Sequence, residues 1–354
     1  MVEYSIIVPI RNEEYFVKNF LLNIEKQTLA KSKFEVILLD GMSTDCTKIE
    51  VDRIKDQLTF KLVIVDNPKK IIPSALNIGY RMAKGHIIIR LDVHSNIKET
   101  YLEHLTTMFK LHSDCCNLGG RTIATGYNAT SRQIAFALNT PFGVGGAKFR
   151  YAQEVTEVDS VFPGIFHKKD LDSIEGWNES WLINEDAELN FRLKKYTNKK
   201  IKVIPDEEMQ IEYYPRSTLK DFAKQYFRYG LWRNKTNVKH PYSMRISHLV
   251  PPVFLVTIII SFLMVFVQFH LIALPLAFLL TYFLLIKRGI GKEIPQELSL
   301  YQLLIVFLVL HFSWGTGTII GYVIFGVPFK GIVKSLSTYL KKVYTFDLKK
   351  LKSD

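Results

Sequence analysis

Five short apolar runs recur in the first 120 positions, and their spacing constrains the fold more than any other feature. The runs cover 5–9, 34–40, 61–66, 86–92 and 117–119, and stretches with helical periodicity separate them. Each run is continuously apolar rather than alternating, so both faces of the sheet must be covered. We therefore predict an α/β fold with a mostly parallel central sheet, in which ligands bind beyond the carboxyl ends of the strands.

Acidic residues follow four of these runs. Asp40, Asp66 and Asp92 end the second, third and fourth runs, and Glu13 and Glu14 follow the first. Any one of these positions is equally well explained by the start of the next helix, where capping residues are common. Because the carboxyl ends of parallel strands share one edge, the four coincidences together favour a binding site.

The tripeptide Asp92-Val93-His94 offers a candidate metal site. Asp92 and His94 are two positions apart, so they point to the same side of an extended chain and can share one ion. A divalent metal that bridges a diphosphate needs only one or two protein ligands. Taken alone, however, the tripeptide fits better with an exposed acid and a cap-like histidine.

The last third of the chain is dominated by three apolar segments, 249–269, 271–286 and 301–325. Each is nearly free of charge and close to the roughly 20 residues that a bilayer span requires. The formal charge is +12, and much of the late excess lies beside these segments, which favours anionic headgroups over nucleic acid as the partner. The preceding stretch 218–233 mixes aromatic and basic residues, as expected of an amphipathic helix at a membrane interface.

These observations predict four regions: a cytosolic domain over 1–215, an interface helix and linker over 216–248, a transmembrane region over 249–327, and a basic amphipathic tail over 328–354. Three full crossings would place the lysine-rich tail outside, against the positive-inside rule. The third apolar segment also carries polar and flexible residues at its centre, from His311 to Gly317. We therefore predict that it bends back as a re-entrant segment, so that both chain ends are cytosolic.

Three segments near the N-terminus match known motifs in order and spacing. Ser5–Glu14, Leu39–Asp45 and the Asp92-Val93-His94 tripeptide resemble the opening motifs of family 2 glycosyltransferases. The resemblance implies a GT-A nucleotide-sugar fold, inversion of the anomeric centre, and Mn²⁺ or Mg²⁺ held at an Asp-x-Asp motif. Here His94 replaces the second Asp, which favours a softer ion such as Mn²⁺. The residues that the resemblance assigns to donor binding are Pro9, Arg11, Glu13, Asp40, Asn67 and Asp92.

The stretch Asn184–Leu189 resembles the acceptor-base motif of the same family. An inverting displacement needs a carboxylate within hydrogen-bond reach of the acceptor hydroxyl. Asp186 is the candidate base, with Glu185 beside it. The alternative explanation is that these acids stabilise the start of a helix running through Leu193, and the two roles are compatible.

A third motif lies in the predicted interface helix. Residues 225–229 resemble the Gln-x-x-Arg-Trp motif of the membrane members of the family, with Tyr229 at the Trp position. Gln225 and Arg228 share a helix face. Arg228 is then expected to neutralise the leaving diphosphate, and Tyr229 to stack near the acceptor. Without the upstream motifs, an aromatic belt with a snorkelling arginine would be the default interpretation of the stretch.

The segment 141–150, together with 229–233 and 313–315, resembles succinoglycan-type exopolysaccharide glucosyltransferases. This resemblance implies transfer of a hexose from a nucleotide-diphosphate sugar, UDP-glucose or a relative, to an isoprenoid-linked saccharide in extracellular or capsular polysaccharide biosynthesis. Two alternatives stay open: transfer directly to polyprenyl phosphate, and a non-enzymatic membrane scaffold. The sequence leaves open the donor, the acceptor hydroxyl and association into a homo-oligomer.

Overall fold

The computed structural model describes residues 1–290 and 294–350, and it divides into two compact units. The N-terminal unit contains Met1–Thr125 and Ala147–Tyr214, and the C-terminal unit contains Gly126–Gly146 and Pro215–Asp354. The segment 126–146 packs with the C-terminal helices rather than with the sheet.

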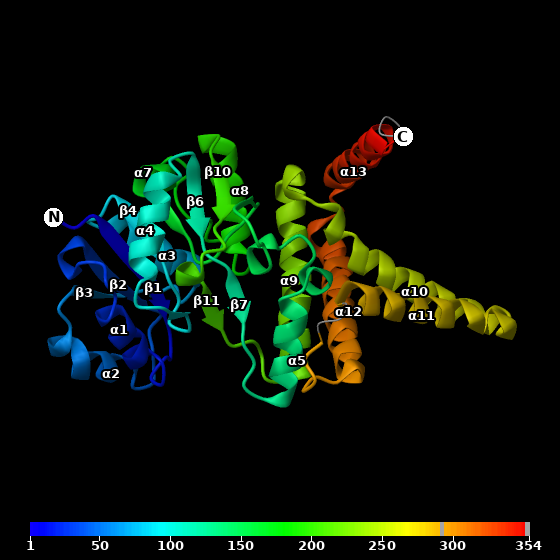
Figure 1. Ribbon diagram of the computed structural model, residues 1–354, viewed down its shortest axis with the longest axis horizontal. Helices are drawn as coiled ribbons and strands as arrows, with labels where there is room; N and C mark the ends of the chain where they lie inside the picture. Colours follow the sequence, from blue (N-terminus) through cyan, green and yellow to red (C-terminus); the bar gives the residue numbers. More distant parts are fainter. Residues whose placement is uncertain (291–293, 351–354) are drawn as a thin grey trace. The chain divides into compact units, whose positions relative to one another are not determined.

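An eight-stranded sheet forms the centre of the N-terminal unit (Figure 1), in the order β3-β2-β1-β4-β9-β6-β10-β8. Its strands are β1 Tyr4–Ile10, β2 Phe34–Asp40, β3 Lys61–Asp66, β4 Ile87–Arg90, β6 Cys115–Gly119, β8 Thr156–Glu157, β9 Ile165–His167 and β10 Lys200–Val203. Neighbouring strands are parallel, except that β9, between β4 and β6, and the edge strand β8 are antiparallel to their neighbours. The predicted α/β fold with a mostly parallel sheet is confirmed, and all five predicted strands are present.

Two helical layers cover the sheet, which explains why its strands are apolar on both faces. Ile6 of β1 packs into a core with α1 and α4, whereas the next residue, Ile7, packs into the opposite core with α3 and α8. The helices of this unit are α1 Val17–Glu25, α2 Thr47–Ile54, α3 Ile72–Met82, α4 Tyr101–Leu111, α7 Lys168–Asp172 and α8 Glu185–Thr197. A small second sheet has the order β5-β11-β7, with β5 Asn96–Ile97, β7 Thr122–Ala124 and β11 Ile211–Tyr213.

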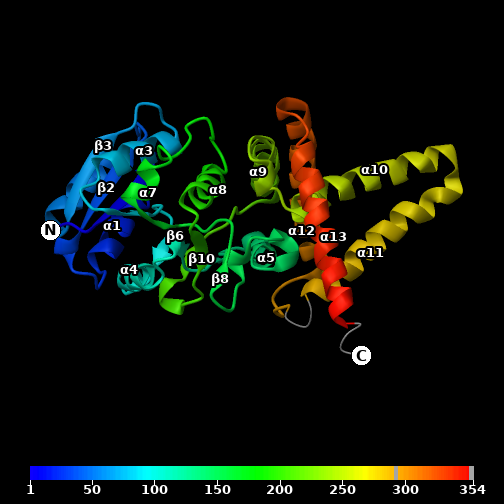
Figure 2. The same ribbon diagram turned by 90° about the horizontal axis from the view of Figure 1, so that it is seen from above.

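The described part of the C-terminal unit is helical. Its helices are α5 Ala129–Leu138, α6 Pro141–Val144, α9 Leu219–Lys239, α10 Val250–Val267, α11 Ala273–Ile290, α12 Leu300–Phe325 and α13 Phe329–Lys350. Helices α10 and α11 meet at one end and project transversely to α9 and α12 (Figures 1 and 2). Among the described residues, two helical stretches, Ile246–Val267 and Leu300–Phe325, are long and apolar enough to cross a membrane.

The predicted re-entrant bend is wrong, because α12 is one uninterrupted helix from Leu300 to Phe325. Its glycines serve close packing instead of bending. A Cβ atom at Gly317 would lie 2.0 Å from the Phe227 carbonyl oxygen, and one at Gly315 would lie 2.8 Å from the Pro251 carbonyl oxygen. Small residues therefore let other helices approach α12 closely, as they do in membrane helix pairs.

Candidate functional site

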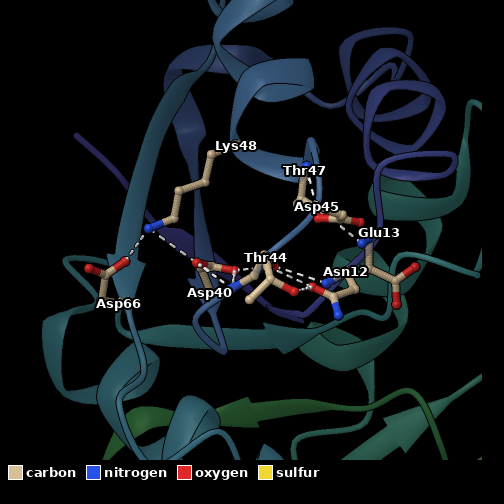
Figure 3. Close-up of polar contacts among 9 residues, drawn as sticks. Asn12, Glu13, Asp40, Thr44, Asp45, Thr47, Lys48 and Asp66 are labelled. Atoms are coloured by element: carbon tan, nitrogen blue, oxygen red, sulfur yellow. Dashed lines mark hydrogen bonds and ion pairs between the residues drawn. The ribbon is translucent and has the colours of Figure 1, made fainter.

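The loops that follow β1 and β2 are braced against each other (Figure 3). The Thr44 backbone N–H donates to Asn12 Oδ1 at 2.9 Å, and the Asn12 backbone N–H donates to Ser43 Oγ at 2.9 Å. One residue along, the Glu13 backbone N–H donates to Thr47 Oγ1 at 2.7 Å. Asn12 has a left-handed φ of 57°, which asparagine tolerates better than most residues. The two loops thus form one hydrogen-bonded rim at the carboxyl edge of the sheet.

Asp40 is the anchor of this rim. Its side chain is fully buried and accepts hydrogen bonds from the Ser43 backbone N–H at 3.1 Å and from Ser43 Oγ at 2.5 Å. Lys48 Nζ lies 3.2 Å from Asp40 Oδ2 and 2.7 Å from Asp66 Oδ1 (Figure 3). Asp40, expected to contact the donor, is therefore engaged with its own loop and with Lys48.

Three other residues expected at the donor site surround the rim. Asn67 is buried, and its backbone N–H donates to the Asp40 carbonyl at 2.7 Å. Asn67 Oδ1 is buried without a hydrogen-bond partner among the described residues. Arg11 is exposed and its Cδ would lie 3.1 Å from a Cβ at Gly41, while Pro9 is partly buried within β1. Because Asn67 and Arg11 touch the loop around Asp40, they share one edge with it.

A second cluster forms around Arg90, the last residue of β4. Its side chain is only 3% exposed, and its Nε lies 3.6 Å from Asp92 Oδ1. Its Nη2 lies 3.4 Å from Glu185 Oε1, and its Nη1 donates to Asp186 Oδ1. The guanidinium also lies 4.7 Å above the centre of the Phe162 ring. One buried cation therefore joins the candidate metal ligand to the candidate base.

Burial and mutual repulsion set the protonation of these acids. Burial, with the charge of Asp186 adding to it, raises the pKa of Glu185 to about 7, although Arg90 opposes the shift. Desolvation also raises the pKa of Asp92 against the pull of Arg90, even though about a third of the Asp92 side chain stays accessible. Glu185 is thus poised between its two protonation states at neutral pH, whereas Arg90 stays charged.

The helix α8 presents the acids from its first turn. Glu185 and Asp186 open the helix, where negative charge is favourable, and Asn184 precedes them with a left-handed φ of 61°. A buried amide pair fixes the helix to the sheet: Asn117 Nδ2 donates to Asn190 Oδ1 at 2.8 Å. The sequence prediction of a helix at this point is confirmed, and it is compatible with a catalytic role for the same acids.

His94, the second predicted metal ligand, contacts residues that follow β1. Its Nε2 lies 3.2 Å from Glu13 Oε1, and its ring packs edge-on against Phe16. Within the described residues no group of three or more His, Cys, Asp or Glu side chains is arranged to hold a metal. Asp92 Oδ1 is buried without a hydrogen-bond partner in that part of the chain. One such carboxylate still fits an ion whose other ligands come from a diphosphate and water.

The third motif lies in the C-terminal unit, on α9. Gln225 Nε2 donates to Tyr229 Oη at 3.1 Å, one helical turn away, and the Tyr229 ring packs edge-on against Tyr226. Arg228 is exposed on the same helix. The described contacts therefore order Gln225 and Tyr229, while the Arg228 side chain is accessible to an anionic group.

Sequence reasoning missed Arg90. The available signal was a charged residue inside the apolar run 86–92, because a buried arginine must be paired with acids. It also missed the amides Asn117 and Asn190, which carry no motif of their own.

The chain is similar in sequence to known proteins. Residues 5–169 match the model of glycosyl transferase family 2. The succinoglycan biosynthesis protein ExoA of Rhizobium meliloti (strain 1021) is 28% identical over 66% of this chain and 70% of its own length. A dolichyl N-acetyl-α-D-glucosaminyl phosphate 3-β-D-2,3-diacetamido-2,3-dideoxy-β-D-glucuronosyltransferase of Methanococcus voltae is 27% identical over 95% of this chain and 98% of its own length.

Among solved structures, the mannosyltransferase PcManGT from Pyrobaculum calidifontis, in complex with GDP-Man and Mn²⁺, superposes with a TM-score of 0.51. It covers 94% of this chain and 87% of its own, at 15% identity, so this likeness shows the fold alone. The mostly parallel sheet and this likeness define a GT-A type transferase fold. Residues 5–169, slightly less than half of the chain, thus match glycosyl transferase family 2.

Proposed function

We propose that this chain is a membrane-bound inverting glycosyltransferase that moves a hexose from a nucleotide-diphosphate sugar to an isoprenoid-linked saccharide at the cytosolic face. The observation that carries the proposal is the Arg90 cluster, which brings Asp92 together with Glu185 and Asp186. The names of the relatives support the class of reaction, since they describe succinoglycan biosynthesis and transfer to a dolichyl-linked sugar phosphate. UDP-glucose or a relative is the donor we favour.

The donor belongs at the rim formed by the loops after β1 and β2. Arg11, Glu13 and Asn67 line this rim and are assigned to donor binding with Pro9, while Asp40 holds the loop in shape through Ser43. Asp92 would hold Mn²⁺ or Mg²⁺ together with the donor diphosphate, and His94 is near enough in sequence to contribute after releasing Glu13. A bound divalent ion would neutralise negative charge developing on the leaving diphosphate.

Asp186 is the proposed general base. The acceptor hydroxyl oxygen attacks the anomeric carbon, its proton passes to the Asp186 carboxylate, and the bond from that carbon to the diphosphate breaks with inversion. Arg90 holds Asp186 in place, and Glu185 adjusts the charge of the pair through its own protonation. Arg228 would stabilise the leaving diphosphate, with Gln225 and Tyr229 beside the acceptor.

Two substitutions separate donor binding from transfer. Thermal-shift assays with UDP-, GDP- and dTDP-sugars plus Mn²⁺ identify the donor, because a ligand at 100 times its dissociation constant adds about 2.7 kcal/mol of stability. We expect Asp92→Asn to lose the metal-dependent part of that shift. Asp186→Asn should keep the shift while transfer falls by about 10²–10⁴-fold. The exposed Asp172→Asn is the matched control, and unchanged transfer in Asp186→Asn would remove it as the base.

The product distinguishes the remaining alternatives. A polyprenyl-phosphate sugar recovered from membranes would select direct transfer to the lipid phosphate, and a lengthened lipid-linked saccharide would select the proposed reaction. A scaffold predicts neither product and no nucleotide-sugar turnover with any donor.

A further inference from the structure

Helix α12 is apolar and long enough to cross a bilayer, but its contacts with α5, α6 and α9 argue against a crossing. We propose that α12 lies along the membrane surface and that, of the described helices, the α10–α11 hairpin is the part that enters the bilayer. The inference rests on the proposed membrane attachment but not on the proposed reaction. It places both ends of α12 on the same side of the membrane as the N-terminal unit.

The first half of α12 is tied to α5 and α6. Gln133 Nε2 of α5 donates to Gln302 Oε1 at 3.1 Å, and the Phe142 ring packs edge-on against Phe307 at 5.2 Å between ring centres. These partners lie in segment 126–146, which leaves the N-terminal unit and returns to it. Crossing a bilayer and returning takes about 40 residues. Segment 126–146 is too short for that, so the start of α12 stays on the side of the N-terminal unit.

The second half of α12 is tied to α9. A Cβ atom at Gly230 would lie 2.2 Å from the Trp314 carbonyl oxygen, so the two backbones nearly touch there. Further along, Asn234 Nδ2 donates to the Gly326 carbonyl at 3.0 Å, beyond the last turn of α12. Contacts at successive points in the same order mean that α9 and α12 run parallel. A bilayer that contains the second half of α12 must therefore also contain α9.

The charge of α9 excludes that arrangement. The part of α9 that runs alongside α12 carries three basic residues, Arg228, Arg233 and Lys235. Each arginine or lysine at the centre of a membrane helix costs about 2.5–3.5 kcal/mol. Three of them would cost on the order of 8–10 kcal/mol. At the membrane surface the helix avoids that cost, and the exposed Arg228 side chain meets water or lipid phosphates.

Helices α10 and α11 have the opposite character. They project together away from α9 and α12 (Figures 1 and 2), and each has 18 residues, or about 27 Å of helix. Large apolar side chains are exposed along α10, among them Val253, Ile260 and Phe266. The hairpin brings the chain back at Lys287 and Arg288, and α12 then crosses its base, where Gly315 meets Pro251. An inserted hairpin explains this exposure without moving α9.

Helix α13 extends the surface in the same manner. Its exposed apolar residues Phe329, Val333, Leu336 and Leu340 follow a helical spacing and form one stripe. Another face docks on segment 241–248, where Ser335 Oγ donates to the Met244 carbonyl at 2.9 Å. Lys330 and Lys341 are exposed beside the stripe. This pattern of apolar face and flanking lysines fits a helix that lies on an anionic bilayer.

Cysteine labelling tests the proposal directly. Gln296→Cys and Lys330→Cys, made separately in a Cys46→Ser background, bracket α12 at exposed positions, and the remaining cysteines, Cys115 and Cys116, are buried. We expect neither variant to react with a membrane-impermeant maleimide in intact cells and both to react after lysis. Cys46 in the otherwise native protein is the reference for the side of the N-terminal unit.

Labelling of one position alone in intact cells would mean that α12 crosses the membrane, and would overturn the proposal. Recovery of the protein in the soluble fraction would overturn it too. The labelling does not depend on turnover. An inactive protein with both positions protected would therefore refute the proposed reaction and support this arrangement.

Discussion

The two units of this protein use charge in opposite ways. The N-terminal unit has 27 Lys and Arg against 29 Asp and Glu, whereas the C-terminal unit has 19 against 5. In the first unit the buried charges meet partners of opposite sign, as in the Lys61–Glu35 pair and the Arg192–Glu188 pair. In the second the excess is positive, and the closest helix contacts are made through glycines.

This difference separates two kinds of specificity. The candidate site needs fixed charges at defined distances, so the N-terminal unit holds them in buried ion pairs. Removing one partner of such a pair costs much of the stability of the fold. For the proposed partner of the C-terminal unit, an extended anionic bilayer, the number of lysines matters more than the placement of each. Its shape depends instead on how closely the backbones of α9, α10 and α12 approach.

Removing the central cation should have the largest effect. Arg90→Ala leaves Asp92, Glu185 and Asp186 without their shared partner, and breaking a buried pair costs about 3–5 kcal/mol. Chemical unfolding of the purified protein measures the loss. The stability of Arg90→Lys should lie between those of the native protein and Arg90→Ala, because lysine keeps the charge but lacks the planar guanidinium group. The exposed Arg81→Ala should change stability by less than about 0.5 kcal/mol, and an equal effect at both sites would contradict the role of the cluster.

A glycine substitution probes the other unit. In Gly317→Leu the new Cβ atom would lie 2.0 Å from the Phe227 carbonyl oxygen, which is a severe clash. We therefore expect a loss of about 3 kcal/mol of folding stability or a separation of α9 from α12. The neighbouring Thr316 is exposed on α12, so Thr316→Leu is a control that introduces the same side chain without a clash. Thermal unfolding in detergent should distinguish the two variants. Equal midpoints would show that α9 and α12 do not pack as described.

Much of this contrast is visible in the sequence, because it depends on local patterns. The runs at 34–40 and 61–66 became β2 and β3, since continuous β-branched stretches between helical ones have few other solutions. The helix predicted at 218–233 is present as α9, with Thr218 capping its first turn through the Asp221 backbone N–H. The acids of α8 were found for the same reason.

The parts that escaped prediction depend on contacts between distant positions. Arg90 and Asp186 are far apart in the chain, and only the folded arrangement brings the start of α8 to the end of β4. The glycines of α12 predicted a bend because sequence alone does not say whether a small residue adjoins a kink or another backbone. The docking of segment 126–146 on α12 likewise rests on one amide pair and a few rings.

Two buried glutamates should respond to pH in opposite directions. Burial alone would raise the pKa of Glu35, but hydrogen bonds from Lys61, the Lys84 backbone and Ser5 lower it overall. Its contribution to stability is present above its unfolded pKa, about 4.5, and is lost as pH falls through the lower folded pKa. Glu185, with a pKa raised to about 7, binds an extra proton in the folded state, so stability falls as pH rises from 4.5 through 7.

The matched variants are Glu35→Gln and Glu185→Gln. Relative to the native protein, Glu185→Gln should gain about 2 kcal/mol between pH 5.5 and 7.5, since one pKa unit corresponds to about 1.4 kcal/mol. Glu35→Gln should be the less stable protein at pH 7 and should approach the native value below pH 4.5. Unfolding midpoints across this range measure both, and parallel pH profiles would contradict the opposite environments of the two residues.

The smallest effects are expected where charge meets lipid. Lys330 and Lys341 are exposed on α13 beside the apolar stripe, and each basic residue near an anionic surface contributes about 1 kcal/mol. In nanodiscs that contain phosphatidylglycerol, the native protein should have a larger free energy of unfolding than in nanodiscs of phosphatidylcholine alone. Lys330→Gln and Lys341→Gln should each remove about 1 kcal/mol of that difference, and the double variant about twice as much, because the attraction is additive along an extended surface. Lys18 is exposed in the N-terminal unit, so Lys18→Gln is a control that changes the net charge by the same amount outside α13. A loss of equal size in Lys18→Gln would mean that net charge, rather than the position of α13 at the bilayer, sets the lipid dependence. High salt should shrink the effect of the α13 variants and leave that of Gly317→Leu unchanged, since only the former is electrostatic.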